Sequence, residues 1–252
     1  MKKIIFAFAL ASILISCKTA NNTTSLTPAA KEEIQVNINL NEIKDDKVFV
    51  TVKFPQIHTD VITYHLPKMV PGTYSDDNYG RFIEDLKAYD TKGNLLAVKK
   101  TDENSWSITN AKTLDKITYW INDTFDIKTK KGVFGGDIFA PAGSNIDAEN
   151  NILLNTHCFV GYFTDFITIP YKLSVSHPSG LWGATSMIDQ DSSTTNDLFL
   201  MPRYAELVEN PIMYSKPNFT TFTVDDMEIL IAVYSPTGKF TAESITPEMK
   251  TM

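Results

Sequence analysis

The sequence predicts a mainly β fold: an antiparallel β-sandwich or saddle-like domain, with the start of a helix at its C-terminus. The composition favours strands, because 28 Thr and 28 aromatic residues stand against only 11 Gly. A hydrophobic content of 43% describes a chain that can bury a core. Short segments in which apolar and polar residues alternate, separated by turn residues, support the same fold class.

The N-terminal residues do not belong to that fold. Lys2 and Lys3 precede an uncharged run over 4–15, which is too short to span a bilayer and is typical of a signal-peptide core. The run ends in Leu14-Ile15-Ser16-Cys17, which resembles the lipobox of bacterial lipoproteins, whose cysteine is acylated and becomes the mature N-terminus. We therefore predict a signal peptide over 1–16 and lipid attachment at Cys17.

These features predict an exported protein that is lipid-anchored to the cell envelope. Lys18 follows the anchor cysteine in place of the Asp linked to inner-membrane retention, so the outer membrane is favoured. Residues 17–31 contain little that a core could bury and are expected to be a flexible tether. An ordinary secretory signal, in which Cys17 is incidental, is the alternative.

The β domain is expected over 32–240. Apolar residues alternate from Ile34 to Leu40 and again from Val48 to Phe54, and Asp45-Asp46 lies between the two runs, so they predict a hairpin. The other expected strands are 60–66, 84–89, 94–99, 104–109, 115–122, 171–177, 183–188, 219–224 and 227–234. Long loops are expected at 128–150 and 189–198.

The last residues predict a short helix. Thr246 is a plausible N-cap and Pro247 suits the first helical position. About six residues cannot offset the cost of helix nucleation, so either the end frays or a following segment completes the helix.

Composition and motifs exclude several functions. The net charge of −7 and the pI near 5.1 repel phosphate backbones, so no nucleic-acid partner is expected. The sequence contains no HExxH zinc motif, phosphate loop, GxGxxG turn or GxSxG elbow. Cys158 lies among apolar and aromatic residues and is expected to be a buried, inert thiol. A Ser-His-Asp triad assembled from distant segments is one function hypothesis that stays open.

Two segments carry a family resemblance. Leu66-Pro67-Lys68-Met69-Val70-Pro71-Gly72-Thr73-Tyr74, with Arg81 downstream, resembles the "MPxWxPGSY…R" stretch in the N-terminal domain of the glycyl aminopeptidase family, peptidase family M61. The segment 86–95 and Trp106 resemble the family's continuation. Tyr204-Ala205-Glu206-Leu207-Val208-Glu209-Asn210-Pro211-Ile212 resembles its "YDELVDSPI". The resemblance covers about residues 32–250.

The resemblance implies a non-catalytic part of a bacterial zinc aminopeptidase that acts on peptides with N-terminal Gly or Ala. Family members join an N-terminal β domain to a thermolysin-like domain that holds the HExxH zinc site. Residues 241–252 would then be the truncated start of the helical catalytic domain. No catalytic residue and no metal ligand transfer to this chain, and zinc is expected in the missing domain.

The same resemblance implies that the β domain packs against the catalytic domain and helps to shape its substrate cleft. The candidate cleft residues are Tyr74, Arg81, Tyr204, Glu206 and Glu209, and a carboxylate among them could pair with the ammonium group of a peptide substrate. The simpler alternative for Glu206 and Glu209 is that they cap or solvate a loop. The runner-up function is a stand-alone lipoprotein β-sandwich that binds peptide or carbohydrate through the aromatic segments around Tyr74 and Tyr79.

Overall fold

The computed structural model describes residues 32–73, 75–125 and 138–252. The predicted signal peptide, Cys17, the tether and Tyr74 lie outside the described residues. The described part is mainly β with a helix near the C-terminus, as the sequence predicts. Across the same residues, none of the helices combines the length and the apolar character that a bilayer crossing requires.

The largest sheet contains both runs of the predicted hairpin. Its strand order is β13(Asn196–Met201), β11(Tyr171–Ser176), β1(Ile34–Lys44), β2(Lys47–Lys53), β8(Leu114–Asn122), β4(Ile83–Asp90) and β5(Leu95–Leu96). The alternation predicts the buried face correctly: Ile34, Val36, Val48 and Val50 are at most 1% exposed. Burying each such side chain stabilises the fold by roughly 1.5–3 kcal/mol. The pairing of β1 with β11 is parallel, whereas the other pairings in this sheet are antiparallel, as the predicted fold class requires.

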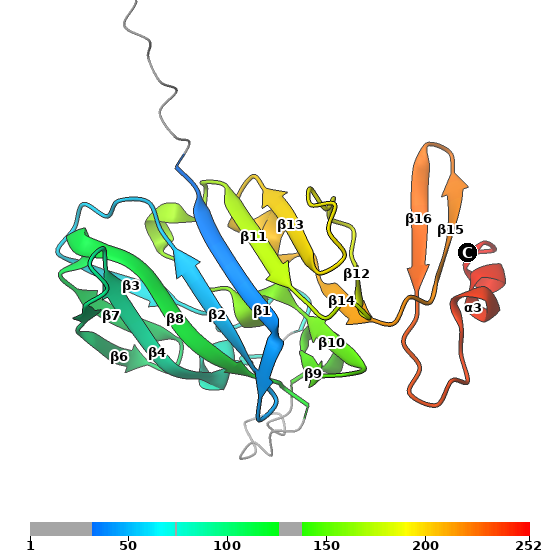
Figure 1. The fold of residues 1–252 in the computed structure, drawn as a ribbon, viewed down its shortest axis with the longest axis horizontal. Coiled ribbons are helices and arrows are strands. Elements are labelled where there is room, and N and C mark those ends of the chain that lie inside the picture. The colour runs from blue at the N-terminus through cyan, green and yellow to red at the C-terminus, as the bar shows by residue number, and fades with distance from the viewer. Residues whose placement is uncertain (1–31, 74, 126–137) are drawn as a thin grey trace, which may run out of the picture. The chain divides into compact units, whose positions relative to one another are not determined.

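Two smaller sheets complete the body of the domain, and Figure 1 shows them behind the large sheet. One has the order β3(Val61–His65), β7(Ser105–Thr109) and β6(Val98–Asp102); the other has β12(Trp182–Ala184), β14(Ile212–Ser215), β10(Asn151–Leu154) and β9(Asn145–Asp147). The hydroxyl oxygens of Tyr64 on β3 and Tyr119 on β8 are 2.9 Å apart within the core between two sheets. The sandwich is therefore closed by a buried hydrogen bond as well as by apolar packing.

Short helical segments connect these strands. They are η1(Tyr79–Phe82), η2(Ala111–Thr113), η3(Ala140–Ala142), α1(Thr156–Phe159), η4(Thr164–Phe166) and α2(Tyr204–Val208). The buried Thr156 hydroxyl donates to the Leu207 carbonyl at 2.7 Å and so joins α1 to α2. Cys158 is 2% exposed and burial raises the pKa of its thiol, which confirms the prediction of an inert cysteine.

Several predicted loops contain strands. β9 lies inside the predicted loop 128–150, of which 128–137 are outside the described residues, and β13 begins inside the predicted loop 189–198. β10 and β14 were not predicted, because each is a short run with little alternation and three of its four residues buried. The strand predicted at 183–188 ends at Ala184, where a hydrogen bond from the Met187 backbone to the Thr185 hydroxyl forms a turn.

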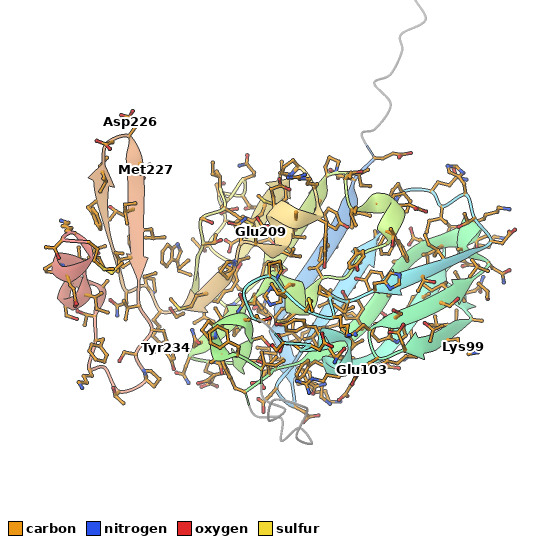
Figure 2. All side chains as sticks on the ribbon, turned by 180° about the vertical axis from the view of Figure 1, so that it is seen from behind. Lys99, Glu103, Glu209, Asp226, Met227 and Tyr234 are labelled. Atoms are coloured by element: carbon orange, nitrogen blue, oxygen red, sulfur yellow. The ribbon has the colours of Figure 1, made fainter. Side chains whose placement is uncertain are left out.

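The C-terminal part consists of the hairpin β15(Phe219–Val224) and β16(Met227–Ala232), followed by α3(Ala242–Met249). The hairpin turn is at Asp225-Asp226, as predicted, and Figure 2 shows Asp226 and Met227 at its tip. The helix start predicted at Thr246 is wrong. Thr241 and Ser244 form a capping box that starts the helix at Ala242, and Pro247 lies inside it.

Candidate functional site

The two segments that carry the family resemblance meet at one groove, which we call the motif groove. It has a volume of about 560 Å³. Its lining consists of loop residues 67–71, His157, Tyr162, Ile167, Thr168, Arg203, and residues 204, 205 and 208 of the second motif. Residues more than 130 positions apart in the sequence therefore form the walls of a single surface feature.

The first wall is a loop fixed by local hydrogen bonds. The Asn78 and Tyr79 amides donate to the Lys68 and Pro67 carbonyls at 2.7 and 3.2 Å and close the base of the loop. The tip turns at Gly72, whose φ of 96° favours glycine. Met69 is 56% exposed at this tip, so the loop presents an apolar side chain to solvent.

The second wall is the start of α2. The Tyr204 hydroxyl donates to the Val160 carbonyl at 2.7 Å, and its ring packs against the rings of Tyr162 and Tyr171. Burial raises the pKa of Tyr204 well above its usual value, so the phenol stays neutral and serves as a fixed donor. Among the predicted cleft candidates that the structure describes, Tyr204 is the one that lines the motif groove.

Buried polar residues support the base of the groove. His157 is 5% exposed, its Nε2 lies 2.9 Å from the Ala142 carbonyl, and its ring meets the Tyr79 ring edge to face. Burial lowers the pKa of His157, which keeps the imidazole neutral near pH 7. Asp77 is 4% exposed, although it lies in a polar segment, and it accepts hydrogen bonds from Ser75 and Tyr79.

A close backbone approach positions Tyr162. The His65 and Tyr162 backbones exchange two hydrogen bonds of 2.9 and 2.8 Å. A Cβ atom on Gly161 would lie 2.3 Å from the His65 carbonyl oxygen, so only glycine permits this approach. The sequence analysis did not identify His157, Gly161 or Tyr162, because their roles depend on contacts with distant segments.

Arg81, Glu206 and Glu209 lie outside the groove lining. Glu206 accepts hydrogen bonds from the Arg203 guanidinium, whose Nε is 2.7 Å from each carboxylate oxygen, and this contact lowers the pKa of Glu206. Glu209, labelled in Figure 2, is the exposed C-cap residue of α2. The Arg81 guanidinium lies 4.8 Å from the centre of the Phe82 ring. A role in a substrate cleft stays a prediction for these three residues and for Tyr74.

The described residues also permit a test of the open triad hypothesis. His65 Nδ1 lies 2.9 Å from Ser105 Oγ, and hydrogen bonds from the Asn104 backbone and the Ser105 side chain lower the pKa of Asp102. Ser105 therefore stands between the imidazole and the carboxylate, whereas a triad places the imidazole between the other two groups. This cluster does not have the order of contacts that activates a serine.

A zinc ion has no fitting site in the described part of the chain. No three His, Cys, Asp or Glu side chains within it are grouped closely enough to hold a metal ion. A catalytic zinc needs three protein ligands and one open position. We therefore derive no catalytic step through a metal held by these residues.

The fold and the groove define a β-sandwich domain with a surface built from two peptidase-type motifs. The chain belongs to the family described as Peptidase M61 N-terminal domain, whose model matches residues 35–216. The match ends immediately before the C-terminal hairpin and helix. No curated protein matches the sequence.

Comparison with solved structures agrees on the fold. The crystal structure of an aminopeptidase N family protein from Idiomarina loihiensis matches with a TM-score of 0.69 and 18% identity, over 86% of this chain and 35% of that chain. Native yeast LTA4 hydrolase matches with a TM-score of 0.39 and 12% identity, over 80% and 31% of the two chains. The M1 zinc metallopeptidase from Deinococcus radiodurans matches with a TM-score of 0.36 and 11% identity, over 87% and 51%.

Proposed function

We propose that this chain is the N-terminal β domain of a zinc aminopeptidase that acts on peptides with N-terminal Gly or Ala, and that the motif groove docks onto its catalytic domain. The observation that carries the proposal is that both family-type motifs converge on one apolar groove. The 35% coverage of the Idiomarina protein leaves room in such an enzyme for a separate catalytic domain. The zinc and the catalytic groups would belong to that domain.

The character of the groove supports a protein occupant. Met69 and Ile167 are 56% and 38% exposed, and large exposed apolar side chains gathered at a groove are typical of interaction surfaces. The nearby charges are already compensated, since Lys68 pairs with Asp76 at 2.9 Å and Arg203 pairs with Glu206 at 2.7 Å. Contact with an apolar partner surface therefore leaves no unpaired charge at these positions.

The C-terminal hairpin and helix fit the same proposal. They follow the end of the family match, and Met227 and Phe240 are 60% and 50% exposed. We propose that residues 217–252 lie at the junction with the catalytic domain. The domain boundary would then fall near residue 217, before the predicted position at 241.

Two experiments test the proposal. The first reads the coding sequence after the Met252 codon: an in-frame HExxH motif supports it, whereas a stop codon followed by unrelated sequence favours the stand-alone binding module. The second places Met69→Asp in the polypeptide that joins this domain to the catalytic domain. A buried carboxylate at the interface should lower kcat/KM for glycyl and alanyl p-nitroanilides by about tenfold or more.

The matched control for Met69→Asp is Leu95→Asp. Leu95 is also exposed, at 64%, but lies on the edge strand β5 and not in the groove lining. Equal activity of the two variants and the parent enzyme would show that the groove does not lie at the interface with the catalytic domain. Tyr79 is 0% exposed, so it cannot supply a contact surface for the stand-alone alternative.

We also propose that the protein is exported and lipid-anchored through Cys17, with the outer membrane as its site. The lipobox-like run before Cys17 supports this proposal. Cells that express the protein with radiolabelled palmitate should yield a labelled band, and Cys17→Ser should abolish the label. An unlabelled parent protein would argue for an ordinary secretory signal.

A further inference from the structure

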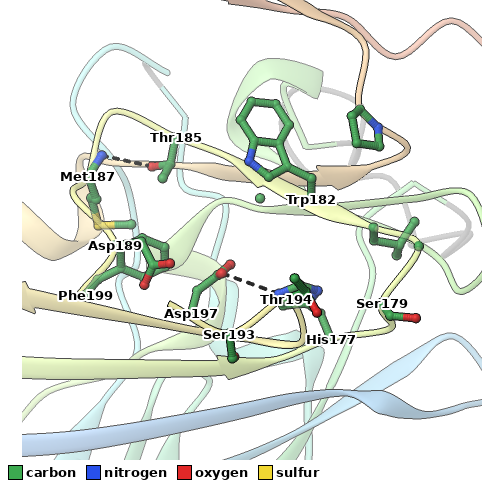
Figure 3. Close-up of a pocket in the computed structure, with 14 residues that line it drawn as sticks. His177, Ser179, Trp182, Thr185, Met187, Asp189, Ser193, Thr194, Asp197 and Phe199 are labelled. Carbon is green, nitrogen blue, oxygen red and sulfur yellow. Dashed lines mark hydrogen bonds and ion pairs between the residues drawn. The ribbon is translucent and has the colours of Figure 1, made fainter. Parts of the chain in front are cut away.

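A second cavity lies between β12 and β13, and we call it the β12–β13 pocket. Its volume is about 540 Å³, within the usual range for small-molecule sites, and residues between His177 and Phe199 supply most of its lining. Figure 3 shows Trp182 on the β12 side of the pocket and Asp197 with His177 on the other side. Neither family-type motif contributes to this pocket, so its role is separate from the proposed docking surface.

The floor of the pocket contains the Asp197 and His177 side chains, and Tyr214, which does not line the pocket, supports Asp197 through a hydrogen bond. The Tyr214 hydroxyl donates to Asp197 Oδ2 at 2.6 Å, and His177 Nε2 lies 3.4 Å from Asp197 Oδ1. His177 and Tyr214 are 3% and 0% exposed, and their rings are 5.0 Å apart. The Asp197 carboxylate is therefore held rigidly and faces the cavity with both oxygens already engaged.

Glycine keeps the floor open. A Cβ atom on Gly183 would lie 2.8 Å from Asp197 Oδ2 and 2.9 Å from the Tyr214 ring. Any larger residue would have to displace the floor of the pocket. Gly180 also lines the pocket and has nothing within 4 Å of the corresponding position, so space remains on that side.

The upper walls combine a flat aromatic surface with oxygen atoms. Trp182 is held by the ring of Phe219, with centroids 4.6 Å apart. Asp189 is positioned by the Leu198 and Asp191 amides, which donate to its Oδ1 at 2.8 and 2.9 Å. Ser193 and Thr194 belong to the same lining, and the Ser193 hydroxyl donates to the Asn196 carbonyl at 3.0 Å, so its oxygen can still accept a hydrogen bond.

This set of groups selects among ligand classes. Two carboxylates repel phosphate and other anions. A metal ion lacks a group of three ligands among the described residues. The Asp197 oxygens are already engaged by Tyr214 and His177. An ammonium ion would therefore have Asp189 as its main carboxylate partner. A neutral ligand with an apolar face and many hydroxyl groups would use the indole, the Asp189 acceptor and the Ser and Thr hydroxyls together.

We propose that the β12–β13 pocket binds a saccharide. One face of a pyranose ring would pack against Trp182, and its hydroxyl groups would donate to the Asp189 carboxylate and exchange hydrogen bonds with Ser193 and Thr194. The rigid Tyr214–Asp197–His177 floor would limit how deeply the ring enters. Such a site gives the domain a binding activity that is independent of peptide cleavage.

The test is isothermal titration of the purified protein with maltose, cellobiose, N,N′-diacetylchitobiose and glycinamide. At least one disaccharide should bind with a Kd of about 1 mM or tighter. Trp182→Ala and Asp189→Asn should each weaken that binding about tenfold or more, while Trp120→Phe and Asp226→Asn should leave it unchanged. Thermal melting of each variant confirms folding, and Asp189→Asn retains the oxygen that accepts the two amides.

Three outcomes would overturn the proposal. The first is no binding of any disaccharide by the folded protein. The second is disaccharide binding that neither Trp182→Ala nor Asp189→Asn weakens. The third is binding of glycinamide without any disaccharide, which would assign the pocket to amines instead.

Discussion

The motif groove and the β12–β13 pocket have similar volumes but opposite chemistry. The groove is rimmed by Met69, Ile167 and Val208, whereas the pocket contains two carboxylates, an imidazole and several hydroxyl groups. Each has a buried histidine at its base, and the two pKa values move in opposite directions. The difference shows that one β-sandwich can present both an apolar surface suited to a protein partner and a polar site suited to a small molecule.

The two histidines explain this contrast in electrostatic terms. His157 faces the Ala142 carbonyl, and burial dominates, so the pKa of His157 is lowered. Burial also lowers the pKa of His177, but the hydrogen bonds to Asp197 and to the Pro178 carbonyl outweigh it, and the pKa of His177 is raised. A carboxylate partner is therefore what separates the polar pocket from the apolar groove.

The largest expected effect on stability comes from replacing Gly161 beside the motif groove and Gly183 beside the β12–β13 pocket. Gly161→Ala brings a Cβ to 2.3 Å from a backbone oxygen, which cannot move without breaking the bridge between His65 and Tyr162. We expect a loss of unfolding free energy of about 3 kcal/mol or more. Gly183→Ala meets the Asp197 and Tyr214 side chains at 2.8 and 2.9 Å, which can shift, so about 1–2 kcal/mol is expected.

Urea unfolding of both variants measures this difference. Gly180→Ala is the matched control, because nothing lies within 4 Å of its added Cβ and its stability should stay within about 0.5 kcal/mol of the parent. If Gly183→Ala lowers the unfolding free energy more than Gly161→Ala does, the floor of the pocket is more rigid than the wall of the groove, contrary to the expectation.

The next largest effect tests the floor of the pocket. Tyr214→Phe removes the donor that lies 2.6 Å from Asp197 Oδ2 and leaves a partly buried carboxylate with one fewer partner. Hydrogen bonds to charged groups contribute about 1.5–3 kcal/mol, so a loss of unfolding free energy in that range is expected. The comparison is Thr156→Val at the contact between α1 and α2, which removes a neutral hydrogen bond to Leu207 and should cost about 1 kcal/mol. Equal losses would show that Asp197 does not depend on Tyr214.

A smaller effect is the opposite dependence of stability on pH. The pKa of His177 is raised in the folded state, so its stabilising effect is complete below about pH 6.5 and is lost as the pH rises through its folded pKa. The pKa of His157 is lowered, so folding is favoured above about pH 6.5 and weakened as the pH falls towards its folded pKa.

NMR titration of the two imidazoles and urea unfolding between pH 5 and 8 measure these effects. Asp197→Asn should lower the pKa of His177 and leave that of His157 unchanged. His157→Gln should remove the loss of stability on the acid side, because the Gln amide can still donate to the Ala142 carbonyl. A His177 resonance that titrates below its ordinary value in the parent protein would contradict the role of Asp197.

The sequence predicts the parts of the fold that depend on local pattern. The β1–β2 hairpin follows from alternation and from Asp45-Asp46, both of which adopt the positive φ that such a turn needs. β10 escaped prediction because Asn151–Leu154 is buried on both faces and shows no alternation. The parallel pairing of β1 with β11 joins residues more than 130 positions apart and has no local signal.

The motif groove and the β12–β13 pocket also differ in how much of each can be predicted from the sequence. The first and second motifs are visible in the sequence, but only the fold shows that they share one groove. The β12–β13 pocket has no sequence signal, because His177, Asp197 and Tyr214 come from three separate segments and are individually ordinary. The fold also shows that the Glu206 carboxylate, which lies in the second motif, is engaged by Arg203, three residues away.

The smallest expected effect concerns the two carboxylates predicted for the substrate cleft. In the polypeptide that includes the catalytic domain, Glu209→Gln should raise KM for a glycyl substrate about threefold with kcat unchanged, because an exposed carboxylate facing a substrate ammonium contributes equally to ground-state and transition-state binding. Glu206→Gln should change neither constant, because Arg203 already engages Glu206. Steady-state kinetics of both variants and the parent enzyme measure these changes in KM and kcat. Unchanged constants for Glu209→Gln would show that its carboxylate does not reach the substrate, and the proposed role of the motif groove would then be docking only.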